Sequence, residues 1–198
     1  DLPDPKLQKA IIQNLEKAAK KSDMCIVTDY GHGALTEKTI NFLSKKNFFL
    51  AVNVQTNAGN RGFNTISKYK RADLIYMAGY ELEIEARKKN INVELGIKNT
   101  LKKIKCKNMT VTQGKDGSIE FFKDKFYRSP ALTSNVVDRV GAGDAYLSIN
   151  SLLKRVDCPV EIAQFLSNIA GSTMVSQIGN KRLLEKKNFI KSVISLLK

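Results

Sequence analysis

The sequence predicts an α/β protein with three layers, α/β/α, built around a mostly parallel central sheet. Short apolar runs, typical of strands buried in a parallel sheet, alternate along the chain with segments whose apolar residues follow the spacing of amphipathic helices. Glycine and polar residues gather in the loops after the strands. Such alternation indicates βαβ units with right-handed crossovers, which bind ligands at the carboxyl ends of their strands. A chain of 198 residues suits one domain of this kind.

The first half of the chain is expected to contain three strands. The first of them, MCIVT, is a continuous apolar run and is expected to be buried on both faces. Thr36 and Asn64 precede helical segments and can cap them. The loop QTNAGNRGFN, residues 55–64, is either a cluster of turns or a binding loop, and both interpretations fit equally well. We expect strands over residues 24–28, 48–54 and 73–77, and helical segments over residues 7–19, 37–45, 65–70, 81–89 and 93–105.

The second half is expected to add a fourth strand, a hairpin and three helices. Lys123 and Asp124 separate two short strand-like segments, which predicts an antiparallel hairpin. Val136 and Val137 are expected to end a strand. We expect strands over residues 109–112, 118–122 and 126–128, and helices over residues 145–156, 159–177 and 184–197. The first of these helices is expected to bury a face made of Ala145, Ile149, Leu152, Leu153 and Val156.

The formal net charge of +14 is compatible with nucleic acid, an anionic membrane surface or an anionic substrate as a partner. The lysines stand in scattered pairs on polar faces of the expected helices, such as Lys20 with Lys21 and Lys102 with Lys103. No basic run is interleaved with aromatic residues, and no helix-turn-helix pattern is present. We therefore interpret the charge as a solvated surface that also attracts phosphorylated substrates, and we expect no nucleic-acid partner.

The sequence lacks the patterns of membrane and secreted proteins. No apolar run approaches the ~20 residues that a spanning helix needs, and the first residues, DLPDP, do not resemble a signal peptide. We therefore expect a cytoplasmic protein without a membrane partner. Cys25, Cys106 and Cys158 are too far apart for a disulfide framework or a zinc site, and His32 has no cluster of other ligand residues around it.

Residues 135–153, NVVDRVGAGDAYLSINSLL, combine a glycine-rich turn with the start of a helix. Gly141 and Gly143 allow positive φ angles and the close approach of a ligand, and a helix N-terminus favours an anion such as phosphate. Asp144 would repel that anion unless it accepts a proton from an alcohol that attacks the phosphate, as in a kinase. The stretch is also typical of a tight loop in which Asp144 stabilises the first helical turn. From these residues alone, that second interpretation fits slightly better.

The segment DRVGAGD, residues 138–144, resembles the DTxGAGD signature of the ribokinase-like (pfkB) carbohydrate kinases. Arg139 stands where that family usually has Thr. The resemblance implies a ribokinase-like fold and the transfer of the γ-phosphoryl group of ATP to a hydroxyl of a sugar or sugar phosphate. It implies that Asp144 is the catalytic base. It also implies an anion hole formed by the backbone N–H groups of Gly141, Ala142 and Gly143.

Other segments resemble the same family in the same order. Residues 111–117, VTQGKDG, are similar to its VTxGxxG loop on the nucleotide side, which places Thr112, Gly114 and Gly117 near ATP. Asn168 begins the segment NIAG, which is similar to the family's Asn-Ala-Ala helix beside the adenine. That similarity implies that Asn168 contacts the adenine, although close packing of helices also explains the small residues.

The stretch DLIYMAGYE, residues 73–81, is similar to the family's DLITPNxxE pattern, in which Asn and Glu organise Mg²⁺ and phosphates through water. Glu81 matches this pattern, whereas Ala78 replaces the Asn. The loss of that polar side chain weakens the expected magnesium arrangement, because Mg²⁺ demands strict octahedral geometry. Asn53 matches a position near the phosphates.

The resemblance implies that residues 1–198 are the C-terminal, ATP-binding part of a sugar kinase domain, because the family's N-terminal strands, lid and Gly-Gly sugar motif are missing. ATP and Mg²⁺ are the expected cofactors. The DYG turn at residues 29–31 resembles members related to heptose-phosphate kinases, including kinase domains joined to a nucleotidyltransferase in sugar-nucleotide synthesis. A fused or associated nucleotidyltransferase and a homodimer are compatible with that resemblance. The alternative is a noncatalytic nucleotide-binding module of such a protein, which Ala78 and the missing sugar-binding half favour.

Overall fold

The computed structural model describes residues 3–57, 59–60, 62–133, 136–176, 178 and 183–198. Parts of three predictions fall outside these residues: the loop 55–64 at Ala58 and Arg61, the motif stretch at Asn135, and the end of a helix at Gln177. The chain divides into two compact units, Asp1–Val111 and Thr112–Lys198.

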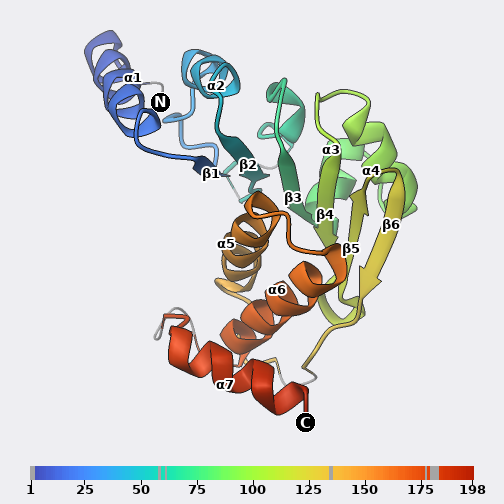
Figure 1. Cartoon of the computed structure of the whole chain (residues 1–198). Coiled ribbons are helices and arrows are strands. Elements are labelled where there is room, and N and C mark those ends of the chain that lie inside the picture. The colour runs from blue at the N-terminus through green and yellow to red at the C-terminus, as the bar shows by residue number, and fades with distance from the viewer. Residues whose placement is uncertain (1–2, 58, 61, 134–135, 177, 179–182) are drawn as a thin grey trace. The chain divides into compact units, whose positions relative to one another are not determined.

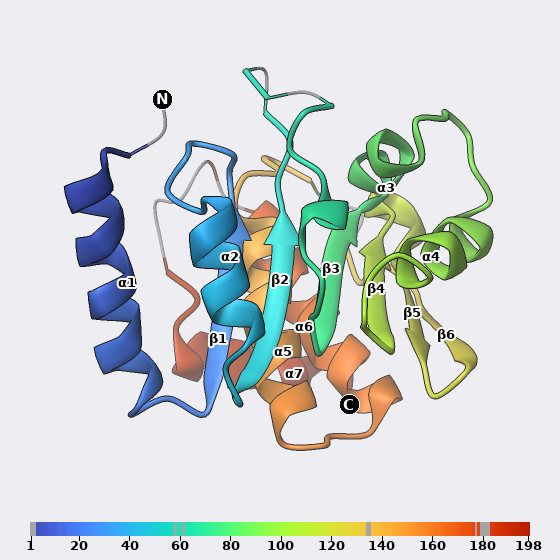
Figure 2. The ribbon, with the colours of Figure 1, turned by 90° about the horizontal axis from the view of Figure 1, so that it is seen from above.

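Unit 1 is an α/β unit with parallel strands. β1 (Met24–Asp29), β2 (Phe49–Val54) and β3 (Leu74–Ala78) lie side by side in chain order, as Figure 2 shows. Thr28 lies opposite Asn53, and Asn53 lies opposite Tyr76, so that the three strands end at the same edge of the sheet. The other elements of this unit are α1 (Pro5–Ala19), α2 (Glu37–Ser44), η1 (Ile66–Lys68), α3 (Gly79–Ala86), α4 (Val93–Leu101) and β4 (Asn108–Thr112) at its end.

The core of unit 1 lies along β2 and β3. Leu50, Leu74 and Ile75 are completely buried, and burying each such side chain stabilises the fold by about 1.5–3 kcal/mol. The predicted cap of α2 is confirmed, because the Thr36 hydroxyl accepts the Thr39 N–H at 3.3 Å.

Two predictions for unit 1 are wrong. β1 is not buried on both faces: Met24, Cys25 and Ile26 are half-buried and Thr28 is exposed. Within the described residues β1 is an edge strand that pairs with β2 alone, so one side lacks the cover that central strands receive. Asn64 does not cap η1, because its amide instead donates to the carbonyl oxygens of Asp29 (2.9 Å) and Gln55 (3.2 Å).

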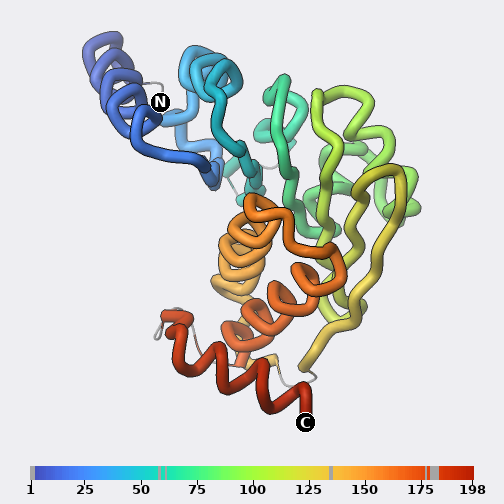
Figure 3. The backbone as a smooth tube through the Cα atoms, in the orientation of Figure 1, coloured from blue at the N-terminus to red at the C-terminus, as the bar shows by residue number. Residues whose placement is uncertain are grey.

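Unit 2 contains the short 3₁₀ helix η2 (Gly114–Asp116), a hairpin and three α-helices. β5 (Ser118–Phe122) and β6 (Lys125–Ser129) pair antiparallel, which confirms the predicted hairpin, and Figure 3 traces its tight turn. The turn residues Lys123 and Asp124 have φ angles of 47° and 62°, as a two-residue turn of type I′ requires. α5 (Ala142–Arg155) packs against α6 (Val160–Val175), and α7 (Lys186–Leu196) follows (Figure 1).

The predicted buried face of α5 is wrong. Leu152 and Val156 are exposed, and the other three residues of that stripe are only half-buried. The helix instead turns a largely polar face inward, from which Tyr146 donates to Ser118 and Lys154 pairs with Glu120, both on the hairpin. That face contains Tyr146, Leu147, Asn150, Ser151 and Lys154.

The strand predicted to end at Val136 and Val137 is also absent from the described residues. Both side chains are half-exposed, and the N–H groups of Val137 and Asp138 donate to the Val175 carbonyl oxygen at 2.8 Å and 3.2 Å. The segment is therefore a loop that is hydrogen-bonded to Val175, the last residue of α6. Its two N–H groups are engaged there and cannot pair with a neighbouring strand.

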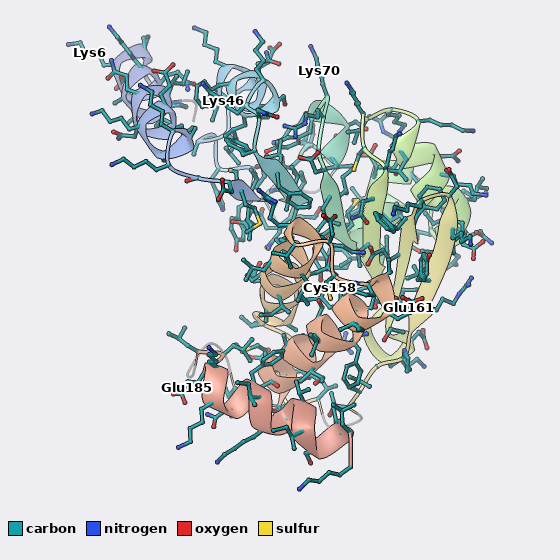
Figure 4. All side chains as sticks on the ribbon, in the orientation of Figure 1. Lys6, Lys46, Lys70, Cys158, Glu161 and Glu185 are labelled. Carbon is teal, nitrogen blue, oxygen red and sulfur yellow. The ribbon has the colours of Figure 1, made fainter. Side chains whose placement is uncertain are left out.

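Several lysines of unit 1 lie at its surface. Figure 4 shows the side chains of Lys6 and Lys70 pointing outward from unit 1, and both residues are exposed. In the part of the chain that the structure describes, every helix is too short or too polar to cross a bilayer.

Candidate active site

Asn53 and Glu81, which the resemblance assigns to the phosphates and the metal, lie together in unit 1. Asn53 is the penultimate residue of β2, and Glu81 lies in the first turn of α3, directly after β3. The Asn53 Nδ2 atom donates to the Tyr76 carbonyl oxygen at 3.0 Å and to Glu81 Oε2 at 3.4 Å. Both side chains are buried. The parallel register thus joins two site residues that are 28 positions apart in the sequence.

The carboxylate of Glu81 is surrounded by donors. Its Oε2 atom accepts the Ala78 N–H at 2.8 Å, and its Oε1 atom accepts the Thr56 N–H and the Tyr80 hydroxyl, each at 3.4 Å. Burial raises the pKa of Glu81, and these hydrogen bonds offset part of that rise. Ala78 has no side-chain acceptor, so only the glutamate half of a capping box forms.

The environment of Glu81 fits a water-mediated role toward Mg²⁺. The short bond to Ala78 fixes the orientation of the carboxylate, while the bonds at 3.4 Å are weak and leave its oxygens able to accept from metal-bound water. Mg²⁺ usually keeps several of its waters in proteins. Among the described residues, no three His, Cys, Asp or Glu side chains group closely enough to hold a metal directly.

A second buried carboxylate, Asp29, lies at the end of β1. The Tyr69 hydroxyl donates to its Oδ2 atom at 2.7 Å, the Lys68 ammonium pairs with the same atom at 2.5 Å, and the Gly31 N–H donates to Oδ1 at 2.9 Å. Burial is the main cause that raises the pKa of Tyr69, and the negative charge of Asp29 is the second. Asp29 therefore ties its own turn to the last residue of η1 and to the residue that follows it.

Asparagine side chains fasten the loop of residues 55–64 onto this turn. The amides of Asn60 and Asn57 donate to the Tyr30 carbonyl oxygen at 2.6 Å and 2.9 Å. Gly31 has a φ angle of 72°, and a Cβ there would lie 2.6 Å from Asn60 Nδ2, so only glycine fits. The sequence alone did not predict these roles of Asp29 and the asparagines. The sequence feature that could have indicated them is the Asn-rich loop after a strand. Over its described residues, this loop is held in place by side-chain hydrogen bonds.

In unit 2, the loop of residues 112–117 closes on itself. The Gln113 N–H donates to the Gly117 carbonyl oxygen at 2.8 Å, and the Gly117 N–H donates to the Gly114 carbonyl oxygen at 3.1 Å. A Cβ on Gly117 would lie 2.0 Å from the Ser129 carbonyl oxygen, whereas a Cβ on Gly114 would meet nothing within 4 Å. The loop is thus anchored at Gly117, while Gly114 leaves its backbone accessible to a ligand.

The GAGD segment forms the N-terminus of α5. Gly141 caps the helix with a φ angle of 80°, and Asp144 is the third helical residue and is half-buried. The first N–H groups of a helix have no carbonyl partner within it. That of Ala142 makes a long turn bond of 3.4 Å to the Arg139 carbonyl oxygen, so it is partly engaged before any anion binds.

Asn168 lies in α6 and is buried. Its Nδ2 atom donates to the hydroxyls of Ser118 (3.2 Å) and Ser129 (2.8 Å), which belong to the hairpin. The small residues after it permit close packing, because a Cβ on Gly171 would lie 3.5 Å from the Ala142 carbonyl oxygen. The amide nitrogen that was expected beside adenine is therefore already paired with protein hydroxyls.

A model of the "pfkB family carbohydrate kinase" matches residues 3–187, nearly the whole chain. The chain belongs to the pfkB family of carbohydrate kinases. This match confirms the resemblance drawn from the DRVGAGD segment and from the other segments that resemble the family.

Among curated relatives, this pfkB chain is 28% identical to the bifunctional protein HldE of Aliarcobacter butzleri, over 87% of the chain and 36% of that protein. It is 29% identical to the HldE protein of Koribacter versatilis, over 89% of the chain and 36% of that protein. The bifunctional relatives agree with the predicted subgroup.

Solved structures confirm the ribokinase-like fold of this pfkB chain. Phosphofructokinase-2 from Escherichia coli matches with a TM-score of 0.76 at 16% identity, over 94% of the chain and 62% of that structure. Arabidopsis thaliana ribokinase, solved with ribose and ATP, matches with a TM-score of 0.75 at 15% identity, over 91% of the chain and 58% of that structure. The chain thus spans little more than a third of the curated relatives and about three fifths of these structures.

Proposed function

We propose that this pfkB-family chain is the C-terminal, ATP-binding part of a carbohydrate kinase domain. The reaction would transfer the γ-phosphoryl group of ATP to a hydroxyl of a sugar or sugar phosphate. The observation that carries the proposal is the position of Asp144 in the first turn of α5, next to the left-handed Gly141. A carboxylate there can accept the hydroxyl proton, while neighbouring N–H groups at the helix N-terminus stabilise the charge on the transferred group.

The other site residues support binding of ATP. Thr112 and Gly114 lie on a closed loop whose backbone at Gly114 is open to a ligand, as the phosphates would need. Asn53 and Glu81 form a pair that can orient metal-bound water. Mg²⁺, when bound, would neutralise charge on the phosphate oxygens. The bifunctional relatives suggest that a fused or associated nucleotidyltransferase accompanies this kinase.

The test is Asp144→Asn in the full-length protein. We expect phosphoryl transfer to a panel of sugars and sugar phosphates to fall by about 10²–10⁴-fold, because a positioned general base contributes that much. Calorimetry should show ATP–Mg²⁺ affinity within about twofold of wild type, since a single carboxylate is lost and no donor is removed. Asp157→Asn, at the exposed C-terminal side of α5, is the matched control. Unchanged turnover in Asp144→Asn would overturn the assignment.

A noncatalytic nucleotide-binding module is the second candidate, and Ala78 favours it. At that position the family's Asn would help to organise Mg²⁺, and alanine supplies no polar group. Under this alternative the full-length protein binds ATP–Mg²⁺ by calorimetry but transfers phosphate to no sugar in the panel. Restoring the amide with Ala78→Asn separates the two candidates further, because only a working kinase should gain turnover from it.

A further inference from the structure

The base of the β5–β6 hairpin carries a buried polar cluster. Ser118 and Ser129 are paired in the antiparallel register, and the Nδ2 atom of Asn168 donates to both hydroxyls, at 3.2 Å and 2.8 Å. The Tyr146 hydroxyl donates to Ser118 Oγ at 3.2 Å. Ser118 is therefore the point at which β5, α5 and α6 meet through hydrogen bonds.

On its N-terminal side, this cluster continues into the predicted nucleotide loop. Gly117 immediately precedes Ser118, and its backbone lies so close to Ser129 that no side chain fits there. The bond between the Gln113 N–H and the Gly117 carbonyl oxygen, 2.8 Å long, closes the loop onto the same point. A displacement of Ser118 would therefore move the whole loop of residues 112–117.

On the helix side, the cluster reaches the candidate base. Tyr146 lies two residues after Asp144 in α5, which is about 3 Å along the helix axis at 1.5 Å per residue. The same helix end packs closely on α6, where Gly171 faces the Ala142 carbonyl oxygen. The Ser118 hydroxyl thus connects the loop of residues 112–117 to the helical turn that carries Asp144.

A buried hydroxyl and amide cluster fixes geometry in a way that apolar packing does not. Hydrogen bonds weaken steeply away from their preferred distance and angle, whereas dispersion contacts tolerate sliding. Asn168 and Tyr146 are almost fully buried, so both must keep their partners or bear the cost of desolvation. The arrangement therefore favours one spacing between the loop and α5.

We propose that Ser118, Asn168 and Tyr146 form a clamp that positions the nucleotide loop relative to Asp144. Asn168 is then a positioning residue that acts through Ser118 and Ser129, and it does not read the adenine. This inference rests on the proposed kinase function for its effect on turnover. The geometry of the clamp is independent of that function.

The test compares Asn168→Ala, Ser118→Ala and the double variant in the full-length protein. We expect each single variant to lower kcat/KM for ATP by about tenfold, and the double variant to be no worse than Asn168→Ala, because both remove one coupled unit. The ratio of kcat/KM for ATP to that for GTP should stay within about twofold of wild type in all three. Tyr146→Phe, which removes the hydrogen bond to Ser118, should lower kcat/KM by about threefold.

Two kinetic outcomes would overturn the clamp. If Asn168→Ala alone changes the ATP-to-GTP ratio by tenfold or more while Ser118→Ala does not, Asn168 contacts the base. If the effects of the two single variants multiply in the double variant, they do not act as a unit. Ser192→Ala, at a half-buried serine of α7 that takes no part in the clamp, serves as the control and should match wild type.

Amide hydrogen exchange separates this proposal from the kinase assignment and from misfolding. In Ser118→Ala and Asn168→Ala, the Gln113 and Gly117 amides should exchange at least fivefold faster than in wild type, with amides of β2 unchanged. That result supports the clamp even if the wild-type protein phosphorylates no sugar, an outcome that would count against the proposed function alone. Equal exchange at Gln113 and Gly117 in all variants would overturn the clamp.

Discussion

Asp29 and Glu81 in unit 1 and Glu120 in unit 2 are buried carboxylates with different kinds of partners. In unit 1, Asp29 and Glu81 lie at the carboxyl ends of strands and accept hydrogen bonds from loop backbone and nearby side chains. In unit 2, Glu120 lies inside strand β5 and pairs with Lys154, which comes from the last turn of α5. Lys154 also lies over the Phe122 ring, 4.5 Å from its centroid.

This difference separates carboxylates that shape a site from one that holds a core together. Asp29 and Glu81 order loops around the polar edge at which α/β folds bind ligands. The Glu120–Lys154 pair is fully buried, and it fastens the C-terminal half of the helix whose N-terminal half carries Asp144. Breaking the two kinds of contact should therefore lower the free energy of unfolding by different amounts and increase amide exchange in different segments.

The largest effect is expected from Lys154→Met. It leaves Glu120 buried without its cation, and breaking a buried pair from one side lowers the free energy of unfolding by about 3–5 kcal/mol. Urea denaturation followed by circular dichroism measures this change.

The double variant Glu120→Leu with Lys154→Met is the matched comparison. It removes both charges, and replacing a buried pair by apolar residues is often neutral, so it should recover most of the lost stability. A loss below about 1 kcal/mol in Lys154→Met would contradict the comparison, because the pair would then behave like an exposed one.

A smaller effect is expected from Asp29→Asn in unit 1. Tyr69 and Lys68 lose a charged acceptor, but Lys68 is 30% exposed, so water compensates for part of the loss. We expect the free energy of unfolding to fall by about 2 kcal/mol, and the amides of residues 30–33 to exchange faster. Asp124→Asn at the exposed hairpin tip is the control and should change stability by less than about 0.5 kcal/mol. A loss in Asp29→Asn as large as that in Lys154→Met would erase the distinction between the units.

The buried pair in unit 2 explains why hydrophobic periodicity failed for α5. The apolar stripe through Ile149, Leu152 and Val156 is regular, and it predicted the wrong buried face. The true face includes Lys154, whose burial depends on Glu120, more than thirty positions earlier in the chain. A sequence pattern within one helix contains no information about such a distant partner, whereas the capping of α2 by Thr36 is local and was predicted correctly.

In the candidate site, too, local features could be predicted from the sequence and contacts between distant residues could not. The segment around Asp144 is contiguous, so its position at a helix N-terminus followed from the sequence. The contact between Asn53 and Glu81 depends on the register of parallel strands, and only their common edge could be expected. The pairing of Asn168 with Ser118 and Ser129 was missed, because it depends on where α6 crosses the hairpin.

The smallest and sharpest test of the comparison is the pH dependence due to Glu81. Burial raises its pKa above the ordinary value of 4.5, so the folded state holds this proton more tightly than the unfolded state. The stability that Glu81 contributes is therefore complete below the ordinary pKa and is lost as pH rises through the raised one. The difference in the free energy of unfolding between wild type and Glu81→Gln should shift against wild type as pH increases from about 4 to about 8.

Glu161→Gln, at an exposed glutamate labelled in Figure 4, is the control and measures the effect of removing one charge elsewhere. A difference that shifts in favour of wild type with increasing pH would mean that the donors around Glu81 outweigh its burial. The donors around Glu81 would then stabilise its ionised carboxylate in the folded protein even without a bound metal.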